Sequence, residues 1–443
     1  MISRRKAVKN TVLAGVGTVL LPQILNSCNK FPKLKKGDFN GDVIIIGAGA
    51  AGLYAGHLLK SLDINFTILE ASPVIGGRMG KLIGFADYPL DLGAQWLHGK
   101  NNLLGKLIRK TKTKITYDNT DIYFWFENKI EANLPDEVEA IFSGKNLPDI
   151  SFLQHAQNKG FGENYRYIVE NLAGDQGAAA SNLSVYWNHK EEEDWNSGDK
   201  DYKFEQTYYD LIANHVAHNI ADKILVNTQV KSIDYSNTKI NLQDQNGTTY
   251  VADKVIISVP ISVLKDGDIS FIPALPEEKT SAFQKIGMGP GMKVFLKFSE
   301  KFFHDNISGG QVCAAYASEH VGKSGNDHLL LAFIMGDQAA ALTVQSDAQI
   351  VQALLNELEI FYPGKAQSTF LDAYVQDWTK HPFIRGAYGY STIGMGNARS
   401  IAQQKVDNKL FFAGEAMQLN ANHQTAHGAV ESGYYAVAEM LEA

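Results

Sequence analysis

The sequence has few cysteines, no repeats and no long tract of one charge, and each absence narrows the kind of protein it encodes. Its 443 residues include two cysteines, Cys28 and Cys313, which excludes a disulfide-rich scaffold. The net charge of −7 shows no basic excess, so we expect no nucleic-acid partner. The chain lacks a G-x-S-x-G elbow, a P-loop and an H-E-x-x-H pattern. His423 and His427 are four residues apart without a third ligand, so we expect no metal site.

The first 28 residues differ from the rest of the chain and resemble an export signal. Arg4 and Arg5 lie in a basic head, and Thr11–Leu25 is mostly apolar but too short to span a bilayer well. The arginine pair resembles a twin-arginine signal, and LNSC resembles a lipoprotein cleavage box with Cys28 as the lipidated residue. We therefore expect a bacterial protein that is periplasmic or anchored to a membrane by lipid; a cleaved signal with an incidental cysteine is the alternative. Residues 29–40 are predicted to form a linker.

A strand, a glycine turn, a helix and a second strand follow in the order of a dinucleotide-binding unit. Val43–Ile46 is an unbroken β-branched run that suits a strand buried on both faces. The glycines of the G-x-G-x-x-G turn after it are Gly47, Gly49 and Gly52. The helix predicted over residues 51–62 directs free N–H groups at the phosphates. Glu70 ends the second strand 18 residues after the last glycine, a spacing that fits a carboxylate on a ribose 2′-hydroxyl.

Two further segments indicate a nucleotide larger than NAD. Gly76-Gly77-Arg78 places a cation just past the acid, within reach of a second phosphate. Residues 90–99, LDLGAQWLHG, offer a tight turn with aromatic and polar side chains. NAD does not need such an element, whereas an extended flavin nucleotide does. From about residue 41 to 443 the sequence resembles the flavin-containing amine oxidase family, which includes polyamine oxidases, monoamine oxidases and flavin-type histone demethylases.

The resemblance implies FAD as the cofactor, held by residues spread along the chain. KLFFAGEA at 409–416 is similar to the family's strand and turn beside the ribityl chain, and a helix from about Ala426 brings backbone N–H groups to the flavin ring. Val230 is the implied contact on the adenine side. With the nucleotide turn included, the implied cofactor residues are Gly47, Gly49, Ala51, Gly52, Glu70, Ala71, Gly77, Arg78, Gly93, Ala94, Gln95, Trp96, Val230, Gly414, Glu415 and Ala426.

The resemblance also implies three catalytic residues. In the family, a lysine at the position of Lys293 holds a water against flavin N5, and the histidine at His98 lies in the substrate tunnel. Tyr388 would stand beside the flavin and attract an amine through a cation–π contact. The alternatives are a solvated strand lysine for Lys293 and a backbone-capped structural histidine for His98. Ala387 stands where monoamine oxidases carry the cysteine that bonds to flavin, so we expect non-covalent FAD.

GAQWLHG, TAHGA and RGAYGY look most like polyamine oxidases, and three departures weigh against other branches of the family. L-Amino acid oxidases place an arginine near the position of Trp96, and this chain has none there. Thr425 stands where monoamine oxidases have the second tyrosine of an aromatic cage. The chain has no room for the helical hairpin of the histone demethylases. The acids of KEEEDW, Glu191–Asp194, are either a tunnel mouth that attracts cations or a solvated loop.

The predicted fold is a two-domain α/β flavoprotein, with a Rossmann-like FAD domain and a mixed-sheet substrate domain. The FAD domain is expected to comprise residues 41–115, 205–270 and 385–443, and the substrate domain residues 116–204 and 271–384.

The implied activity is oxidation of a C–N bond in a polyamine-like, primary or secondary amine. Hydride passes to flavin N5, the imine hydrolyses to an aldehyde, and dioxygen becomes hydrogen peroxide. The alternatives are an L-amino acid oxidase or a desaturase-like flavoenzyme of the same fold, and a flavin-bound membrane scaffold without catalysis.

Overall fold

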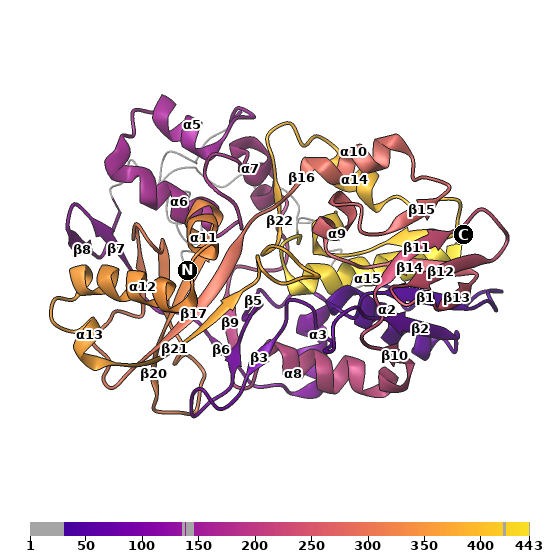
Figure 1. Ribbon diagram of the computed structural model, residues 1–443, viewed down its shortest axis with the longest axis horizontal. Helices are drawn as coiled ribbons and strands as arrows, with labels where there is room; N and C mark the ends of the chain where they lie inside the picture. The colour runs from indigo at the N-terminus through magenta and orange to yellow at the C-terminus, as the bar shows by residue number, and fades with distance from the viewer. Residues whose placement is uncertain (1–30, 135–137, 139–145, 420–421, 443) are drawn as a thin grey trace, which may run out of the picture.

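The computed structural model describes residues 31–134, 138, 146–419 and 422–442, and it contains two principal sheets (Figure 1). The predicted export signal and Cys28 lie outside the described residues. Among the described residues, no helix is long and apolar enough to cross a membrane.

A five-stranded parallel sheet carries the predicted nucleotide turn. Its strands, in spatial order, are β10 (Ile224–Leu225), β2 (Phe66–Leu69), β1 (Val43–Ile46), β14 (Lys254–Ile257) and β23 (Leu410–Phe412). Ile45 packs on one face with helices α2 (Ala50–Ser61) and α15 (Ala426–Glu442). Ile44 and Ile46 pack on the other face, which explains why the whole strand is apolar.

The second face of this sheet is covered by a smaller sheet and three short helices. The strands of the smaller sheet are β11 (Val230–Asp234), β12 (Ile240–Asp244), β13 (Thr249–Ala252) and β15 (Ser270–Ile272), in the order β13-β12-β11-β15. The helices on this side are α9 (Ile261–Lys265), α10 (Glu277–Lys285) and α14 (Ala398–Gln403), the first two packing through Ile261 and Phe283.

A seven-stranded mixed sheet forms the other half of the molecule. In spatial order its strands are β21 (Phe370–Asp377), β17 (Gly291–Phe298), β20 (His328–Met335), β19 (Ala315–Ser318), β18 (Asn306–Ser308), β7 (Ile122–Phe126) and β8 (Lys129–Glu131). Most neighbours are antiparallel, but β18 and β7 are parallel. The helices α11 (Gly336–Thr343) and α12 (Asp347–Phe361) pack on one face, whereas Phe295 and Phe333 face Trp96 on the other.

Figure 1 shows the two halves side by side, with β17, β20 and β21 on the left and the parallel sheet with α15 packed on one of its faces on the right. The expected α/β fold with a mixed second sheet is therefore confirmed. The strands of the five-stranded sheet come from the segments assigned to the FAD domain, and those of the seven-stranded sheet from the other two. The residue boundaries of the domains stay a prediction.

The remaining elements connect these sheets. The strands are β3 (Lys81–Leu82), β4 (Leu90–Asp91), β5 (Trp96–His98), β6 (Ile115–Tyr117), β9 (Asp201–Phe204), β16 (Ile286–Met288) and β22 (Gly389–Ser391). The helices are α3 (Leu103–Thr111), α5 (Phe152–Asn158), α6 (Arg166–Gly174), α7 (Val185–Glu193), α8 (Tyr208–Ile212) and α13 (Ala366–Thr369).

The prediction of a linker over residues 29–40 is wrong for its described part. Phe31 is buried, with its ring 5.3 Å from Tyr434 and 5.8 Å from Tyr435 of α15. The Tyr434 hydroxyl donates a hydrogen bond to the carbonyl of Pro32. The basic composition of this segment concealed its apolar residues, which pack against the core, so the segment is docked on the domain.

Candidate active site

One cavity of about 630 Å³ is lined by residues from both halves of the molecule. The glycine turn after β1, Arg78 and the start of α15 line it from the first half, and β17 and β20 contribute Lys293 and Phe333 from the second. It gathers Lys293, His98 and Tyr388, together with every predicted cofactor residue except Gly52. Residues from widely separated parts of the sequence thus meet at one site.

The glycine turn leaves open space at the beginning of α2. Gly49 is the N-cap residue, and a Cβ built on it would meet no atom within 4 Å. Gly47 has a φ of 100°, a conformation that L side chains rarely adopt. A Cβ on Gly52 would lie 2.0 Å from the Gly47 carbonyl oxygen, so Gly52 allows close packing behind the turn. The N-terminus of α2 therefore faces the cavity without a side chain in front of it.

Glu70 lies at the carboxyl end of β2 and is held by the backbone. Its two carboxylate oxygens accept hydrogen bonds from the N–H groups of Ala48 (2.6 Å) and Ser72 (2.8 Å). Burial raises the pKa of Glu70, and these two hydrogen bonds oppose that rise. Because its carboxylate is fixed at the edge of the cavity, Glu70 presents an acceptor at a defined position.

Arg78 and Glu415, both predicted to contact the cofactor, form an ion pair of 2.8 Å. Arg78 also donates to the carbonyl of Ala387 at 2.8 Å, and Glu415 accepts from the N–H of Gly389 at 3.1 Å. Gly414, just before Glu415, has a φ of 141°, and a Cβ built on it would make an ordinary contact of 3.9 Å with the Val259 carbonyl oxygen. The pair joins the turn after β2 to the turn after β23 beside the cavity.

Lys293 is buried near the start of β17 and contacts the segment from β4 to β5. Its ammonium group donates to the backbone oxygen of Asp91 (3.0 Å) and to the side-chain oxygen of Gln95. It lies 5.6 Å from the centroid of the Trp96 ring. Burial lowers the pKa of Lys293 to about 8, while Glu319 and Asp91 act to raise it. The expectation of a solvated strand lysine is therefore wrong, because only 2% of this residue is exposed.

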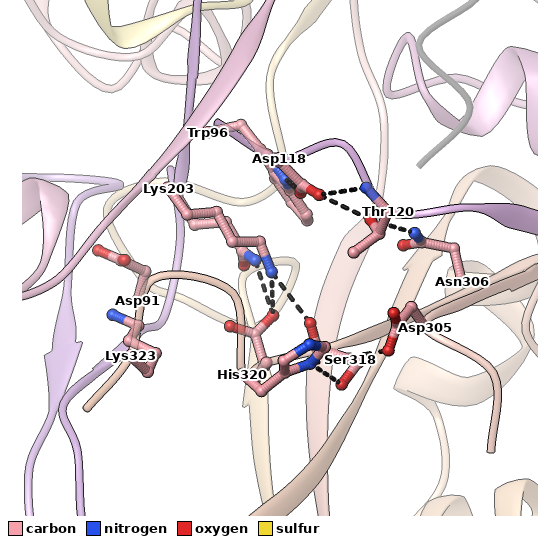
Figure 2. A network of polar contacts seen from close by, with 12 residues as sticks. Asp91, Trp96, Asp118, Thr120, Lys203, Asp305, Asn306, Ser318, His320 and Lys323 are labelled. Atoms are coloured by element: carbon pink, nitrogen blue, oxygen red, sulfur yellow. Dashed lines mark hydrogen bonds and ion pairs between the residues drawn. The ribbon is translucent and has the colours of Figure 1, made fainter. Parts of the chain in front are cut away.

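Behind Lys293 lies a buried ion pair that the sequence analysis missed. The Gln95 amide donates to Glu319 at 2.7 Å, and Glu319 pairs with Lys203 of β9 at 3.4 Å. Figure 2 shows Lys203 directed toward Ser318, whose backbone oxygen it reaches at 3.1 Å. The side chains of Lys203 and Glu319 are 3% and 2% exposed. No local pattern reveals this pair, because its partners are more than a hundred residues apart.

The same network fixes the indole of Trp96. Its N–H donates to Asp118 at 2.9 Å, and Thr120 donates to the other oxygen of Asp118 at 2.6 Å (Figure 2). Asn306 of β18 donates to the Thr120 hydroxyl at 2.7 Å. The ammonium group of Lys203 lies 5.0 Å from the centroid of the Trp96 ring. Trp96 is therefore held rigidly at the wall of the cavity.

His98 and Tyr388 also line the cavity, and each is oriented by a hydrogen bond. A ring nitrogen of His98 lies 2.8 Å from a carboxylate oxygen of Asp201. The Tyr388 hydroxyl donates to the backbone oxygen of Asp175 at 3.0 Å. A carboxylate contact orients His98, so the backbone-capped alternative does not describe it. The catalytic roles of both residues stay predictions.

Comparison with known proteins decides the family. Residues 132–441 match the family model described as flavin containing amine oxidoreductase, and residues 45–111 match the NAD(P)-binding Rossmann-like domain. The chain belongs to the flavin-containing amine oxidoreductases. FAD is therefore the expected cofactor of this member of the family.

The relatives of this amine oxidoreductase include proteins named as polyamine oxidases and proteins named as histone demethylases. It is 29% identical to probable polyamine oxidase 4 of Arabidopsis thaliana over 442 residues, which cover 90% of this chain and 86% of the relative. It is 27% identical to human lysine-specific histone demethylase 2, covering 97% of this chain and 55% of that protein. The chain thus spans about half the length of the demethylase.

Solved amine oxidases share the fold. Cyclohexylamine oxidase from Brevibacterium oxydans superposes with a TM-score of 0.78 at 19% identity, covering 91% of this chain and 99% of the other. Putrescine oxidase bound to putrescine gives a TM-score of 0.77 at 19% identity, covering 93% and 100%. At this identity the likeness shows the fold alone.

The cavity of this amine oxidoreductase has features that suit FAD. The open Cβ position of Gly49 and the uncrowded one of Gly414 leave room for a ligand to approach the backbone. The N-terminus of α2 suits a pyrophosphate and the fixed Glu70 carboxylate suits a ribose, while Val230 and Ala426 line other parts of the cavity. These residues fit an extended dinucleotide.

The acids of residues 190–195 lie at the end of helix α7, with Asp194 as its C-cap, so the prediction of a loop is wrong for Glu191–Glu193, although Glu193 and Asp194 are exposed. Glu191 is half-buried on α7, with ion-pair distances of 2.8 Å to His423 and 3.6 Å to Arg399. Burial opposes ionisation of Glu191, but His423 and Arg399 outweigh it and hold its pKa below the usual value. Glu191 and Glu192 line the cavity, whereas Glu193 and Asp194 pair with residues one turn earlier on α7.

The two histidines near the C-terminus contact different partners. His423 pairs with Glu191, and the buried His427 ring lies 5.6 Å from the Trp195 ring centroid. Among the described residues, no group of three or more His, Cys, Asp or Glu side chains is arranged to hold a metal ion. Thr425 accepts a hydrogen bond from the N–H of Gly428 at 2.9 Å and so caps the start of α15.

Proposed function

We propose that the chain is an FAD-dependent amine oxidase acting on a polyamine-like or other primary or secondary amine. The observation that carries the proposal is the single cavity that joins the glycine turn, the buried Lys293 and the aromatic side chains of Trp96 and Tyr388. When bound, FAD accepts hydride from the carbon next to the amine nitrogen and passes the electrons to dioxygen. The imine product hydrolyses to an aldehyde.

The protein would bind and orient the amine. Trp96, Phe333 and Tyr388 line the cavity and offer aromatic surfaces to an alkylamine, and cations bind well to such faces. Asp118 and Glu192 also line it, and carboxylates attract the distal ammonium groups of a polyamine. Lys293 would keep a donor directed at the cavity from the buried side.

The state of the arginine that lines the cavity argues against an L-amino acid oxidase. Among the described residues that line it, Arg78 is the one arginine, and its guanidinium already pairs with Glu415. Bidentate recognition of a substrate carboxylate uses a free, fork-shaped guanidinium. Ala387 lies beside Tyr388 in the cavity wall and has no sulfur for a bond to flavin, which supports non-covalent FAD.

Anaerobic reduction tests the substrate. The FAD-loaded protein would be mixed separately with spermidine, spermine, their acetylated forms, tyramine and L-amino acids, while flavin absorbance is followed. We expect rapid bleaching by polyamines. Bleaching by tyramine or an amino acid alone would overturn the polyamine assignment, and no bleaching by any of them would favour a desaturase-like enzyme or a scaffold.

We also propose that the protein is exported and carries lipid on Cys28. The support is the sequence alone: an arginine pair, a short apolar stretch and LNSC before the folded chain. Intact-mass measurement of protein from the membrane fraction tests it. An unmodified N-terminus at another residue would contradict the lipid.

A further inference from the structure

Positive charge is concentrated in two short segments of an acidic protein. Residues 99–117 contain six lysines and arginines and no acid, and residues 31–36 contain three lysines and no acid. The whole chain nevertheless has a net charge of −7. Such an uneven distribution creates a local positive field on an otherwise negative molecule.

The fold brings these two segments together. Phe31 packs on α15, and the Lys106 ammonium group of α3 lies 5.2 Å from the centroid of its ring. We define a basic face by the exposed positive residues of this region other than the ion-paired Lys114: Lys33, Lys35, Lys106, Arg109, Lys110 and Lys112. Lys110 also lies near enough to His57 of α2 to help burial lower the pKa of that histidine.

Nearby acids leave the basic face largely uncompensated. Glu205 pairs with Lys114 at 3.0 Å, and Asp63 accepts a hydrogen bond from Lys36 through its backbone oxygen. Asp38 is an exposed acid two residues beyond Lys36. None of the ion pairs recorded for residues 31–442, outside the undescribed gaps, involves a member of the basic face.

The short stretch of chain between Cys28 and the basic face indicates which partner this face fits. Cys28 precedes the docked Phe31 by three residues, a span of about 10 Å at most. A lipid on Cys28 would bring the basic face close to the bilayer surface. We propose that the basic face docks the protein on a membrane surface rich in anionic lipid. Lysine and arginine side chains near such a surface are attracted to it electrostatically.

Vesicle binding tests the proposal without the lipid anchor. The chain from residue 29 contains every described helix and strand, so it serves as the starting protein. We expect it to sediment with phosphatidylcholine vesicles containing about 30% phosphatidylglycerol and to be released by about 0.5 M NaCl. The combined variant Lys33→Gln, Lys35→Gln, Lys106→Gln, Lys110→Gln should bind at least about tenfold more weakly.

A matched variant separates this face from net charge. Lys159, Lys301, Lys365 and Lys380 are exposed lysines elsewhere in the chain, and their joint replacement by Gln changes the net charge equally. This control should bind like the starting protein. Equal loss in both variants, no loss in the first, or equal binding to pure phosphatidylcholine would overturn the proposal. Selective binding to an acidic protein or a nucleic acid would also overturn it.

The result of the vesicle experiment does not depend on the proposed catalysis, because vesicle binding needs no substrate. Amine oxidation in solution should be the same in both quadruple variants and the starting protein, since none of the replaced lysines lines the cavity. Loss of vesicle binding with unchanged oxidation would locate the effect in the basic face.

Discussion

At the scale of single residues, Lys293 is an ammonium group whose charge is set by opposing effects. Burial lowers its pKa to about 8, and the two neighbouring lysines, Lys203 and Lys323, act in the same direction. Glu319 and Asp91 oppose them by favouring the charged form. As a result, the Lys293 ammonium group can lose a proton near physiological pH inside the proposed active site.

Replacing Glu319 should therefore shift the ionisation of Lys293. Glu319→Gln removes a negative charge but retains an oxygen toward Gln95 and Lys203, so the ammonium form of Lys293 becomes less stable. Its pKa should fall below about 8, and the corresponding break in the pH profile of kcat/KM should move about one pH unit lower.

The substrate amine titrates in the same profile, so a second variant must assign the break. Lys293→Met has no ionisable group at this position and should lack the break, while the titration of the substrate remains. A break that persists in Lys293→Met, or one that does not move in Glu319→Gln, would contradict the assignment. The absorption spectrum of bound FAD would show whether each variant still forms its cofactor site.

At the scale of elements, one lysine joins a helix end to the parallel sheet. Lys279 of α10 donates to three backbone oxygens at the end of α14, those of Ile401 (3.3 Å), Ala402 (2.7 Å) and Gln404 (2.5 Å). Its ammonium group lies 3.7 Å from the ring centroid of Phe412 on β23. A cation at a helix C-terminus also interacts favourably with the helix dipole.

Lys279→Met should destabilise the protein because it leaves those carbonyl groups without their shared donor. The expected loss is about 2–4 kcal/mol of unfolding free energy, which would appear as a lower melting temperature. Lys285→Met, at an exposed position at the end of the same helix, is the matched control and should change stability by less than about 0.5 kcal/mol. Similar melting temperatures for the two variants would refute the capping role.

Local patterns predicted the elements whose residues are close in sequence. The strand, glycine turn, helix and acid from Val43 to Glu70 occupy the expected order, because backbone geometry and burial dictate those residue types within one βαβ unit. Lys293 was placed on a strand, but its burial depends on Gln95, which lies 198 residues away. The pairing of Glu191 with His423 was missed for the same reason, since adjacent acids give no sign of a distant partner.

At the scale of the whole molecule, the two ends of the described chain are packed together. The basic residues near Phe31 suggested a solvated linker, because the pattern of charges shows nothing of the apolar surface that receives its ring. That surface is formed by Tyr434 and Tyr435 of the last helix. Since α15 also packs on α2 and begins beside the cavity, the docked segment is continuous with the core of the FAD-binding half.

Phe31→Ala should therefore destabilise the protein although it lies only three residues after the predicted lipidation site. Loss of a buried aromatic ring typically costs about 3–5 kcal/mol, and a site near a chain end should relax and lose somewhat less. Thermal unfolding of the chain from residue 29 would measure the change, and limited proteolysis should cleave near Pro32 more rapidly in the variant. Lys33→Ala, in the same segment but exposed, should leave both measurements unchanged. If Phe31→Ala unfolds and is cleaved like the starting protein, the segment behaves as a free linker and the basic face loses the contact that holds its two parts together.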